Sequence, residues 1–252
     1  MSHIFSSTRR HSSYIALAAI LLLTLTACQD ASTEGIGESE DVLRHQAKKN
    51  LSSNKHHAAI DPLTHLSNNF QVGANARIYR LELMHSLYKA KEYARAADTA
   101  DQYIKIYPYE ADVDYALYMK TLASLEEFNT RHWVPRLTRE RYGYTDTKIL
   151  DDALVSANRL LASYPKSRYV PETAYMASQI REVFMKKNYH IAREYRARKA
   201  FAASQKRLTD VVVFTDSKQL LHDSLVMMRD NYTSMNMHKD AEKINQIIEL
   251  NW

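Results

Sequence analysis

Small and aromatic residues recur along this chain at a fixed separation. Five alanines are each followed, eleven positions later, by an aromatic residue: Ala59 and Phe70, Ala96 and Tyr107, Ala153 and Tyr164, Ala203 and Phe214, Ala241 and Trp252. Within each pair an apolar residue also follows the alanine by seven or eight positions, as Leu66 and Ile248 do. Positions with these separations return to one face of an α-helix. Each segment is therefore predicted to be an amphipathic helix.

Proline follows the aromatic residue directly in two segments, Tyr107-Pro108 and Tyr164-Pro165, where it would stop the helix. A small residue, an aromatic residue and a proline in this order are typical of the second helix of a tetratricopeptide repeat (TPR), whose usual period is about 34 residues. We therefore predict an all-α protein, an α-solenoid of five TPR helical hairpins. The low glycine and proline contents, four and five residues in 252, agree with this fold class.

The repeat is regular at both ends of the chain and expanded in the middle, because the alanines are 37, 57, 50 and 38 residues apart. In the first long interval the helical pattern ends near Phe128. Residues 129–147 then hold a proline, a glycine and four arginines, which predicts an inserted loop in repeat 3. In the second long interval no helix breaker lies between Glu172 and Ala200, which predicts one long helix in repeat 4.

The segment before the repeats has the pattern of a bacterial lipoprotein signal. Arg9-Arg10 precedes a mostly apolar run at residues 14–25, which is shorter than the roughly 20 residues that cross a bilayer. The run ends in Leu25-Thr26-Ala27-Cys28, and Cys28 is the only cysteine. Residues 1–27 are therefore predicted to be a cleaved signal peptide, and Cys28 to carry S-diacylglycerol and an N-palmitoyl chain. The alternative is a soluble secreted protein with a stray cysteine.

The mature chain is predicted to begin with a flexible tether, residues 28–41, which is acidic, contains two glycines and lacks periodicity. Residues 42–252 then form the TPR domain, with repeats that close near residues 70, 107, 164, 214 and 252. Two or more acyl chains give stable membrane anchoring. Gln29, rather than the aspartate that retains lipoproteins in the inner membrane, follows Cys28. The expected location is the outer membrane, facing the periplasm.

The sequence lacks the motifs of catalysis and of cofactor binding. It has no glycine-rich phosphate loop, no GxSxG and no HExxH, and the adjacent His56 and His57 would point about 100° apart on a helix. Loss of Arg9-Arg10 with the signal lowers the net charge from +5 to about +3, which is too low to indicate nucleic acid. We expect a binding protein that is not an enzyme, with no metal and no cofactor except the covalent lipid on Cys28.

Four local sequences carry a resemblance to a known family. They are VDYALYMK at residues 113–120, YPKSRY at 164–169, IAREYRARKAFAA at 191–203 and MNMHKDAEK at 235–243. In that order they resemble the DYxxYxR, YPNSQY, VAxYYxxRGAWxAA and QMNxxAEK segments of the BamD family, also called YfiO or ComL. These are TPR lipoproteins of the outer-membrane β-barrel assembly (BAM) machinery. The resemblance covers about residues 42–252.

The chain departs from this family in two places. Residues 70–75 read FQVGAN where the family has YPFGPY, so a substrate pocket built there would differ. Lys199 stands where the family has the glycine of RGAW, which is compatible with a helix that continues through this position.

The resemblance implies that the C-terminal repeats bind the last POTRA domain of BamA, with Arg207 paired to an acidic residue there. The positive charge of this region fits an acidic partner, because residues 181–207 hold nine basic and two acidic side chains. Arg207 also lies four residues after Ala203, where a repeat usually places an inward apolar side chain, and a charge there needs a partner. The alternative is a solvated helix face. The candidate BamA-binding residues are Arg207, Arg198, Lys206 and Arg193.

The resemblance also implies that the N-terminal repeats bind an extended, aromatic-ended signal of unfolded outer-membrane proteins. Tyrosine combines apolar area with a polar tip, which suits peptide binding. Each candidate could instead pack inside the repeats. The candidate contacts are Tyr79, Tyr88, Tyr103, Tyr115 and Tyr118.

The implied function is that of a scaffold lipoprotein for folding and inserting outer-membrane proteins. Its implied partners are BamA, other BAM lipoproteins, unfolded outer-membrane proteins and, through the lipid, the inner leaflet of the outer membrane. One alternative is another TPR lipoprotein, such as a pilotin for pilus or secretin assembly, against which the two long repeat intervals argue. A second is an enzyme of cell-wall turnover, whose catalytic constellation is absent from the sequence.

Overall fold

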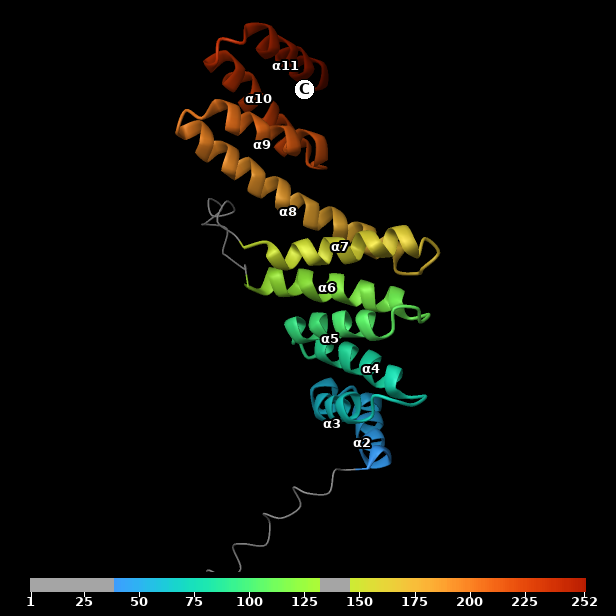
Figure 1. Cartoon of the computed structure of the whole chain (residues 1–252). Coiled ribbons are helices and arrows are strands. Elements are labelled where there is room, and N and C mark those ends of the chain that lie inside the picture. The colour runs from blue at the N-terminus through green and yellow to red at the C-terminus, as the bar shows by residue number, and fades with distance from the viewer. Residues whose placement is uncertain (1–38, 132–145) are drawn as a thin grey trace, which may run out of the picture. The chain divides into compact units, whose positions relative to one another are not determined.

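The computed structural model describes residues 39–131 and 146–252, and in these residues all regular structure is helical (Figure 1). Residues 44–252 form a compact unit that contains α3 to α11. Within it each helix packs against the next in sequence, which confirms the predicted all-α array of helical hairpins. The described helices are α2 (Glu40–Ser52), α3 (His56–Asn69), α4 (Ala76–Lys89), α5 (Tyr93–Ile106), α6 (Val113–Arg131), α7 (Lys148–Ser163), α8 (Val170–Ala197), α9 (Phe201–Phe214), α10 (Lys218–Ser234) and α11 (His238–Asn251).

In four of the five repeats the second helix ends as the alanine and aromatic pattern suggests. Ala59, Ala96, Ala153 and Ala241 are all buried. The aromatic residues eleven positions later are the C-caps of α3, α5, α7 and α11, and each backbone N–H donates to the carbonyl four residues earlier. A small residue lets the neighbouring helix approach closely. The alanines therefore mark where neighbouring helices pack together, and the aromatic residues mark where the helices end.

Repeat 4 follows the same pattern one residue later than predicted. Ser204 is fully buried, whereas Ala203 is only partly buried. The C-cap of α9 is Thr215, and Phe214 is exposed. The alignment of Ala203 and Phe214 with the other four pairs was therefore wrong. Three small residues follow one another at 202–204, and the sequence alone does not show which of them faces the neighbouring helix.

Four described hairpin turns share one backbone geometry. Asn54, Lys91, Lys199 and Asn236 have positive φ angles of 55°, 63°, 61° and 59°. In each turn the next N–H donates to the carbonyl five residues earlier, as Ala200 does to Tyr195 at 2.9 Å. This is the Schellman motif, in which a left-handed residue ends a helix. The expectation that Lys199 continues the helix was wrong, because α8 ends at Ala197.

The expanded middle of the array contains the long helix that the sequence predicts. α8 has 28 residues and begins two positions before Glu172, and at 1.5 Å per residue it is about 42 Å long. It packs against α7 on one side and α9 on the other, so it connects the N-terminal and C-terminal repeats. α6 continues past Phe128 to Arg131, and residues 132–145 of the predicted loop lie outside the described residues.

The N-terminal predictions fall largely outside the described residues. These include the signal peptide 1–27, Cys28 and most of the tether. Glu40 and Asp41, which we assigned to the tether, already belong to α2. In the described part of the chain no helix combines the length and apolar character needed to span a membrane.

Candidate functional site

A pocket of about 740 Å³ lies between α4, α6 and the turn that leads into α8. Tyr88 comes from α4, Tyr115 and Tyr118 come from α6, and Tyr169 comes from the turn. We call this the tyrosine pocket. Three of its four tyrosines are among the five that the sequence analysis named as peptide contacts, and the fold brings these three together.

Tyr169 completes the aromatic wall of the pocket. Its ring stacks on Tyr118 with a centroid distance of 4.6 Å and an interplanar angle of 19°, and it lies 5.5 Å from the ring of Tyr115. Tyr118 also forms a hydrogen bond with Glu172 in the first turn of α8. The sequence analysis noted the YPKSRY turn but did not assign Tyr169 to the site. The turn is 51 positions from Tyr118, and only the packing of α8 against α6 joins them.

Both signs of charge surround the aromatic wall. Lys89, Lys166 and Arg168 line the pocket together with Asp112 and Asp114. The Arg168 guanidinium lies 4.8 Å from the centroid of the Tyr169 ring, a cation–π geometry. The pocket therefore combines aromatic rings and the aliphatic Met119 and Leu122 with charged side chains of both signs.

Besides these charged side chains, the pocket has uncharged hydrogen-bonding groups in Tyr115, Tyr118 and His85. Burial raises the pKa of the Tyr115 hydroxyl to about 12, and burial together with Glu172 raises the pKa of Tyr118 well above its usual value. Burial, His56 and Lys89 lower the pKa of His85, whose Nδ1 lies 3.3 Å from the Tyr115 hydroxyl oxygen. The pocket therefore presents ring faces, hydroxyls and a neutral imidazole.

Tyr79 and Tyr103 belong to the core and offer a bound peptide no surface. Their exposed fractions are 3% and 0%. Tyr103 lies seven positions after Ala96, on the inward face of α5, and its ring contacts Tyr107 at 5.1 Å. The sequence placed Tyr103 on this inward face as well, so its use as a peptide contact conflicts with its packing role.

Arg207, the main candidate for partner binding, is partly buried between α8 and α9. Its Nη1 donates to the Asn188 side-chain oxygen at 3.3 Å, and it forms no ion pair with any residue in 39–131 or 146–252. With Ser204 as the inward small residue, the inward position four residues later is Leu208, which is fully buried. Arg207 therefore flanks the inward face, and our argument that it replaces an inward apolar residue was wrong.

The other three basic candidates are exposed. Lys206 is one position from Arg207 on α9 and points to solvent, as does Arg193 on α8. Arg198, at the end of α8, pairs with Glu194 at 3.7 Å, and both side chains are mostly exposed. Such exposed pairs contribute little to stability. The fold thus places all four residues on the α8–α9 hairpin but separates the turn residue Arg198 from the Arg207–Asn188 contact.

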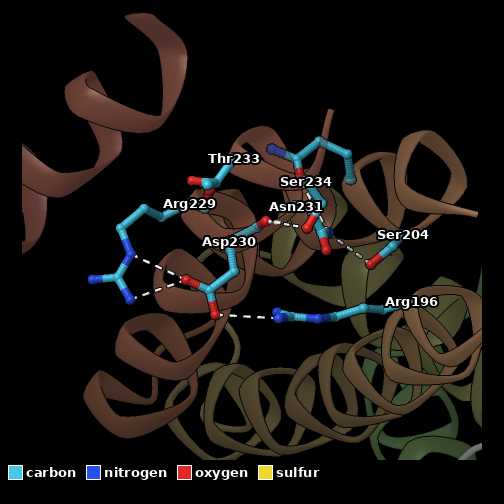
Figure 2. Close-up of polar contacts among 8 residues, drawn as sticks. Arg196, Ser204, Arg229, Asp230, Asn231, Thr233 and Ser234 are labelled. Atoms are coloured by element: carbon cyan, nitrogen blue, oxygen red, sulfur yellow. Dashed lines mark hydrogen bonds and ion pairs between the residues drawn. The ribbon is translucent and has the colours of Figure 1, made fainter. Parts of the chain in front are cut away.

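A polar network that the sequence analysis did not identify joins repeats 4 and 5 (Figure 2). Asp230 on α10 accepts from Arg196 of α8 at 3.3 Å and from Arg229 at 3.0 Å. Next to it the fully buried Asn231 donates to the Ser204 hydroxyl at 2.9 Å and to the side-chain Oε1 of Gln205 at 3.3 Å. Buried polar contacts of this kind favour one alignment of neighbouring helices. They hold α10 in place against the α8–α9 hairpin.

The histidines do not form a metal site in the described part of the chain. His56 and His85 contact edge to face with centroids 5.5 Å apart. Within residues 39–131 and 146–252 no three histidine, cysteine, aspartate or glutamate side chains gather closely enough to hold an ion.

Helices that pack in sequence order as hairpins define the class of this protein as an all-α, TPR-like array. More narrowly, the chain belongs to the YfiO family, described as outer membrane lipoprotein, whose model matches residues 38–247. This confirms the resemblance and the predicted location at the outer membrane. It also agrees with the prediction that the chain is not an enzyme.

Individual relatives are distant but extend over nearly the whole chain. The chain is 24% identical over 238 residues to outer membrane protein assembly factor BamD of Pasteurella multocida (strain Pm70), covering 94% of this chain and 89% of that one. It is 21% identical over 247 residues to the protein of the same name in Neisseria gonorrhoeae, with coverages of 94% and 91%. Among solved structures, "MamA RS-1 ArsTM double mutant" aligns at 12% identity over 85% of this chain and 95% of that chain, with a TM-score of 0.36, too low to establish a shared fold.

Proposed function

We propose that this lipoprotein is an outer-membrane protein assembly factor that acts as a binding scaffold and performs no catalysis itself. Its family membership and the name shared by its relatives support this role. In this proposal Cys28 carries the lipid, the repeats face the periplasm, and the protein is a member of a BAM complex. The tyrosine pocket is the single observation that carries the proposal, because a scaffold for unfolded clients needs a preformed site for an extended chain.

The client site is the tyrosine pocket. The stacked rings of Tyr118 and Tyr169, with Tyr88 and Tyr115 beside them, would contact aromatic and aliphatic side chains of an unfolded outer-membrane protein. Lys166 and Arg168 at its border would favour an acidic group or a terminal carboxylate of the client. Tyr79 and Tyr103 are not part of this site.

Peptide binding tests the client site. A fluorescent peptide that ends in the aromatic C-terminal residue of an outer-membrane β-barrel protein should bind the full chain, and Tyr118→Ala or Tyr169→Ala should weaken binding about 10-fold or more, as loss of a central aromatic contact does. Tyr175→Ala is the matched control, since this tyrosine is 63% exposed on α8 and does not line the pocket. Circular dichroism would show that each variant is folded. Equal affinities for all variants would exclude the tyrosine pocket.

The partner site lies on the α8–α9 hairpin, where Arg207 would pair with a carboxylate of the last POTRA domain of BamA. Asn188 holds the guanidinium in position without neutralising it. Arg193, Arg198 and Lys206 would supply the surrounding positive charge. Other BAM lipoproteins would attach to the same scaffold.

Charge-reversal variants distinguish a specific ion pair with BamA from nonspecific electrostatic attraction. Arg207→Glu should cost about 2 to 5 kcal/mol of binding if the pair is desolvated, and Lys206→Glu much less, because Lys206 faces solvent. Copurification with BamA should fail for Arg207→Glu and recover when the partner carboxylate is reversed. Equal losses for both variants would indicate a diffuse basic surface, and no loss for either would remove this hairpin from the interface.

The lipid is tested at Cys28 itself. Mass spectrometry of the mature protein should find an acylated N-terminal peptide that begins at Cys28, and Cys28→Ala should yield an unprocessed or soluble form. A free thiol at Cys28 in the mature protein would contradict the anchor.

A further inference from the structure

Most large apolar side chains of the repeat unit that are at least half exposed lie at one of its two edges, with Val155 on α7 and Tyr175 on α8 as exceptions. Successive helices are antiparallel, so α3, α5, α7, α9 and α11 all end at the same edge, where the turns between repeats follow one another (Figure 1). We call this the inter-repeat edge. Large apolar side chains that are about half to fully exposed lie there in both halves of the unit: Val72, Ile106 and Tyr109 in the first, and Val213, Phe214 and Leu250 in the second.

The degree of exposure at the N-terminal end of this edge is extreme. Val72 is 97% exposed at the tip of the α3–α4 turn, and Tyr109 is 98% exposed at the tip of the α5–α6 turn. Neither side chain contributes to the core, so folding does not explain an apolar residue at these tips. Single exposed apolar residues are ordinary on protein surfaces. Their concentration at one edge is the feature that needs a cause.

The opposite edge has a different composition. It carries the turns inside the hairpins, at residues 53–55, 90–92, 198–200 and 235–237. Within these described turns the exposed residues are mainly polar or basic, and Met237 is the one large apolar side chain that is exposed. Among the turns that the structure describes, the highly exposed apolar tips therefore lie at the inter-repeat edge.

We infer that the inter-repeat edge rests on the phospholipid surface of the membrane that anchors the protein. Apolar side chains with a tyrosine among them enter the boundary between headgroups and acyl chains, and nearby lysine and arginine side chains meet lipid phosphates. The acidic Glu110 beside Tyr109 is paired with Arg77 at 3.8 Å, so its charge does not oppose this contact. The inference rests on the proposed lipid anchor but not on the proposed client or BamA sites.

The position of the lipid anchor in the sequence means that weak contacts at this edge are sufficient to hold it against the membrane. Cys28 precedes Glu40, the first residue of α2, by 12 positions, and a chain of that length spans at most about 40 Å. The start of α2 is therefore held close to the bilayer, and for the first repeats this confinement raises the effective concentration of the surface to the millimolar range. Separate apolar tips suit a fluid surface, which accepts each one independently. A folded protein partner would instead need a continuous complementary patch.

Site-specific labelling tests this placement in the lipidated protein. Lipidation consumes Cys28, so an introduced cysteine is the only free thiol of the mature chain. An environment-sensitive NBD dye is attached at Val72→Cys, Tyr109→Cys or Phe214→Cys, and the protein is reconstituted in vesicles of phosphatidylethanolamine and phosphatidylglycerol. Ser53→Cys and Lys239→Cys are matched controls, because both residues are exposed at or beside the opposite edge.

Labels at the inter-repeat edge should emit at shorter wavelength than the controls and be quenched by nitroxide-labelled lipids. Emission equal to that of the controls would overturn the inference. Shielding that arises only when the purified assembly complex is reconstituted alongside would also overturn it, because a protein would then cover this edge.

A second measurement does not depend on the anchor. In a chain that begins at Gln29, which carries neither the signal segment nor the lipid, a fraction should float with the same vesicles. The triple variant Val72→Ser, Tyr109→Ser, Phe214→Ser of that chain should lose several-fold in the floated fraction. Equal flotation of both chains would contradict the inference. Peptide binding to the tyrosine pocket, measured on the same triple variant, should be unchanged, and this separates a failure of the membrane contact from a failure of the proposed function.

Discussion

Lys199 offers a sharp test of the structure, because the left-handed backbone of this residue was not foreseen from the sequence. Its φ angle of 61° places the side chain where an L-residue other than asparagine is disfavoured, by about 1 to 2 kcal/mol. Glycine has no β-carbon and avoids this cost, but it loses about 0.5 to 1 kcal/mol more conformational entropy on folding. Lys199→Gly should therefore stabilise the protein by about 0.5 to 1 kcal/mol.

A matched control lies seven positions further along the same hairpin. Lys206 is exposed in the interior of α9, where its backbone is helical. The identical substitution Lys206→Gly relieves no strain there and should destabilise the protein by about 0.5 to 1 kcal/mol, the usual cost of glycine inside a helix. The same chemical change should thus have opposite signs at two nearby positions.

Urea unfolding followed by circular dichroism measures both effects as shifts of the transition midpoint. For a chain of this size 1 kcal/mol corresponds to about 2 to 4 °C in melting temperature, so thermal unfolding gives an independent reading. Lys91→Gly should add to Lys199→Gly, because Lys91 has the same conformation in a separate hairpin. Equal destabilisation by Lys199→Gly and Lys206→Gly would refute the reasoning and show that α8 continues through Lys199.

Three further predictions concern the packing and the pocket. Ser204→Phe should destabilise the protein by about 1 to 3 kcal/mol through overpacking, and Ala203→Phe much less; thermal unfolding that ranks them the other way would restore the original alignment of repeat 4. Asn231→Ala should cost about 1 to 3 kcal/mol in urea unfolding because Ser204 and Gln205 lose their partner, whereas the exposed control Asn68→Ala should stay within about 0.5 kcal/mol. The folded-state pKa of His85 is lowered, so its contribution to stability is present above the unfolded value of about 6.5 and is lost as pH falls through the folded value. His85→Asn should reduce the fall of melting temperature on acidification, and an unchanged pH profile would contradict this assignment.

Only part of the client site could be predicted from the sequence. Tyr88, Tyr115 and Tyr118 could be named because the resemblance implies a client site in the N-terminal repeats and tyrosine suits peptide binding. Tyr169 could not, because its ring reaches Tyr118 only through a turn 51 positions away. Tyr79 and Tyr103 have the same chemistry as the pocket tyrosines, and burial alone distinguishes them.

The sequence by itself determined what depends on local spacing. It specified the all-α class, the five second helices and the long α8, because helical periodicity, small residues and aromatic caps act within a few turns of one chain segment. It also supported the family, through short motifs whose order is kept along the chain.

Only the tertiary structure decided what depends on a neighbouring helix. Ser204 rather than Ala203 faces inward because Asn231 of α10 approaches it there, and Lys199 is left-handed because α9 must return along α8. Asp230 acquires Arg196 of α8 as a partner in the same way. These outcomes are set by contacts between residues far apart in sequence, and the strength of those contacts depends on how neighbouring helices pack. The periodicity within one helix does not predict that packing.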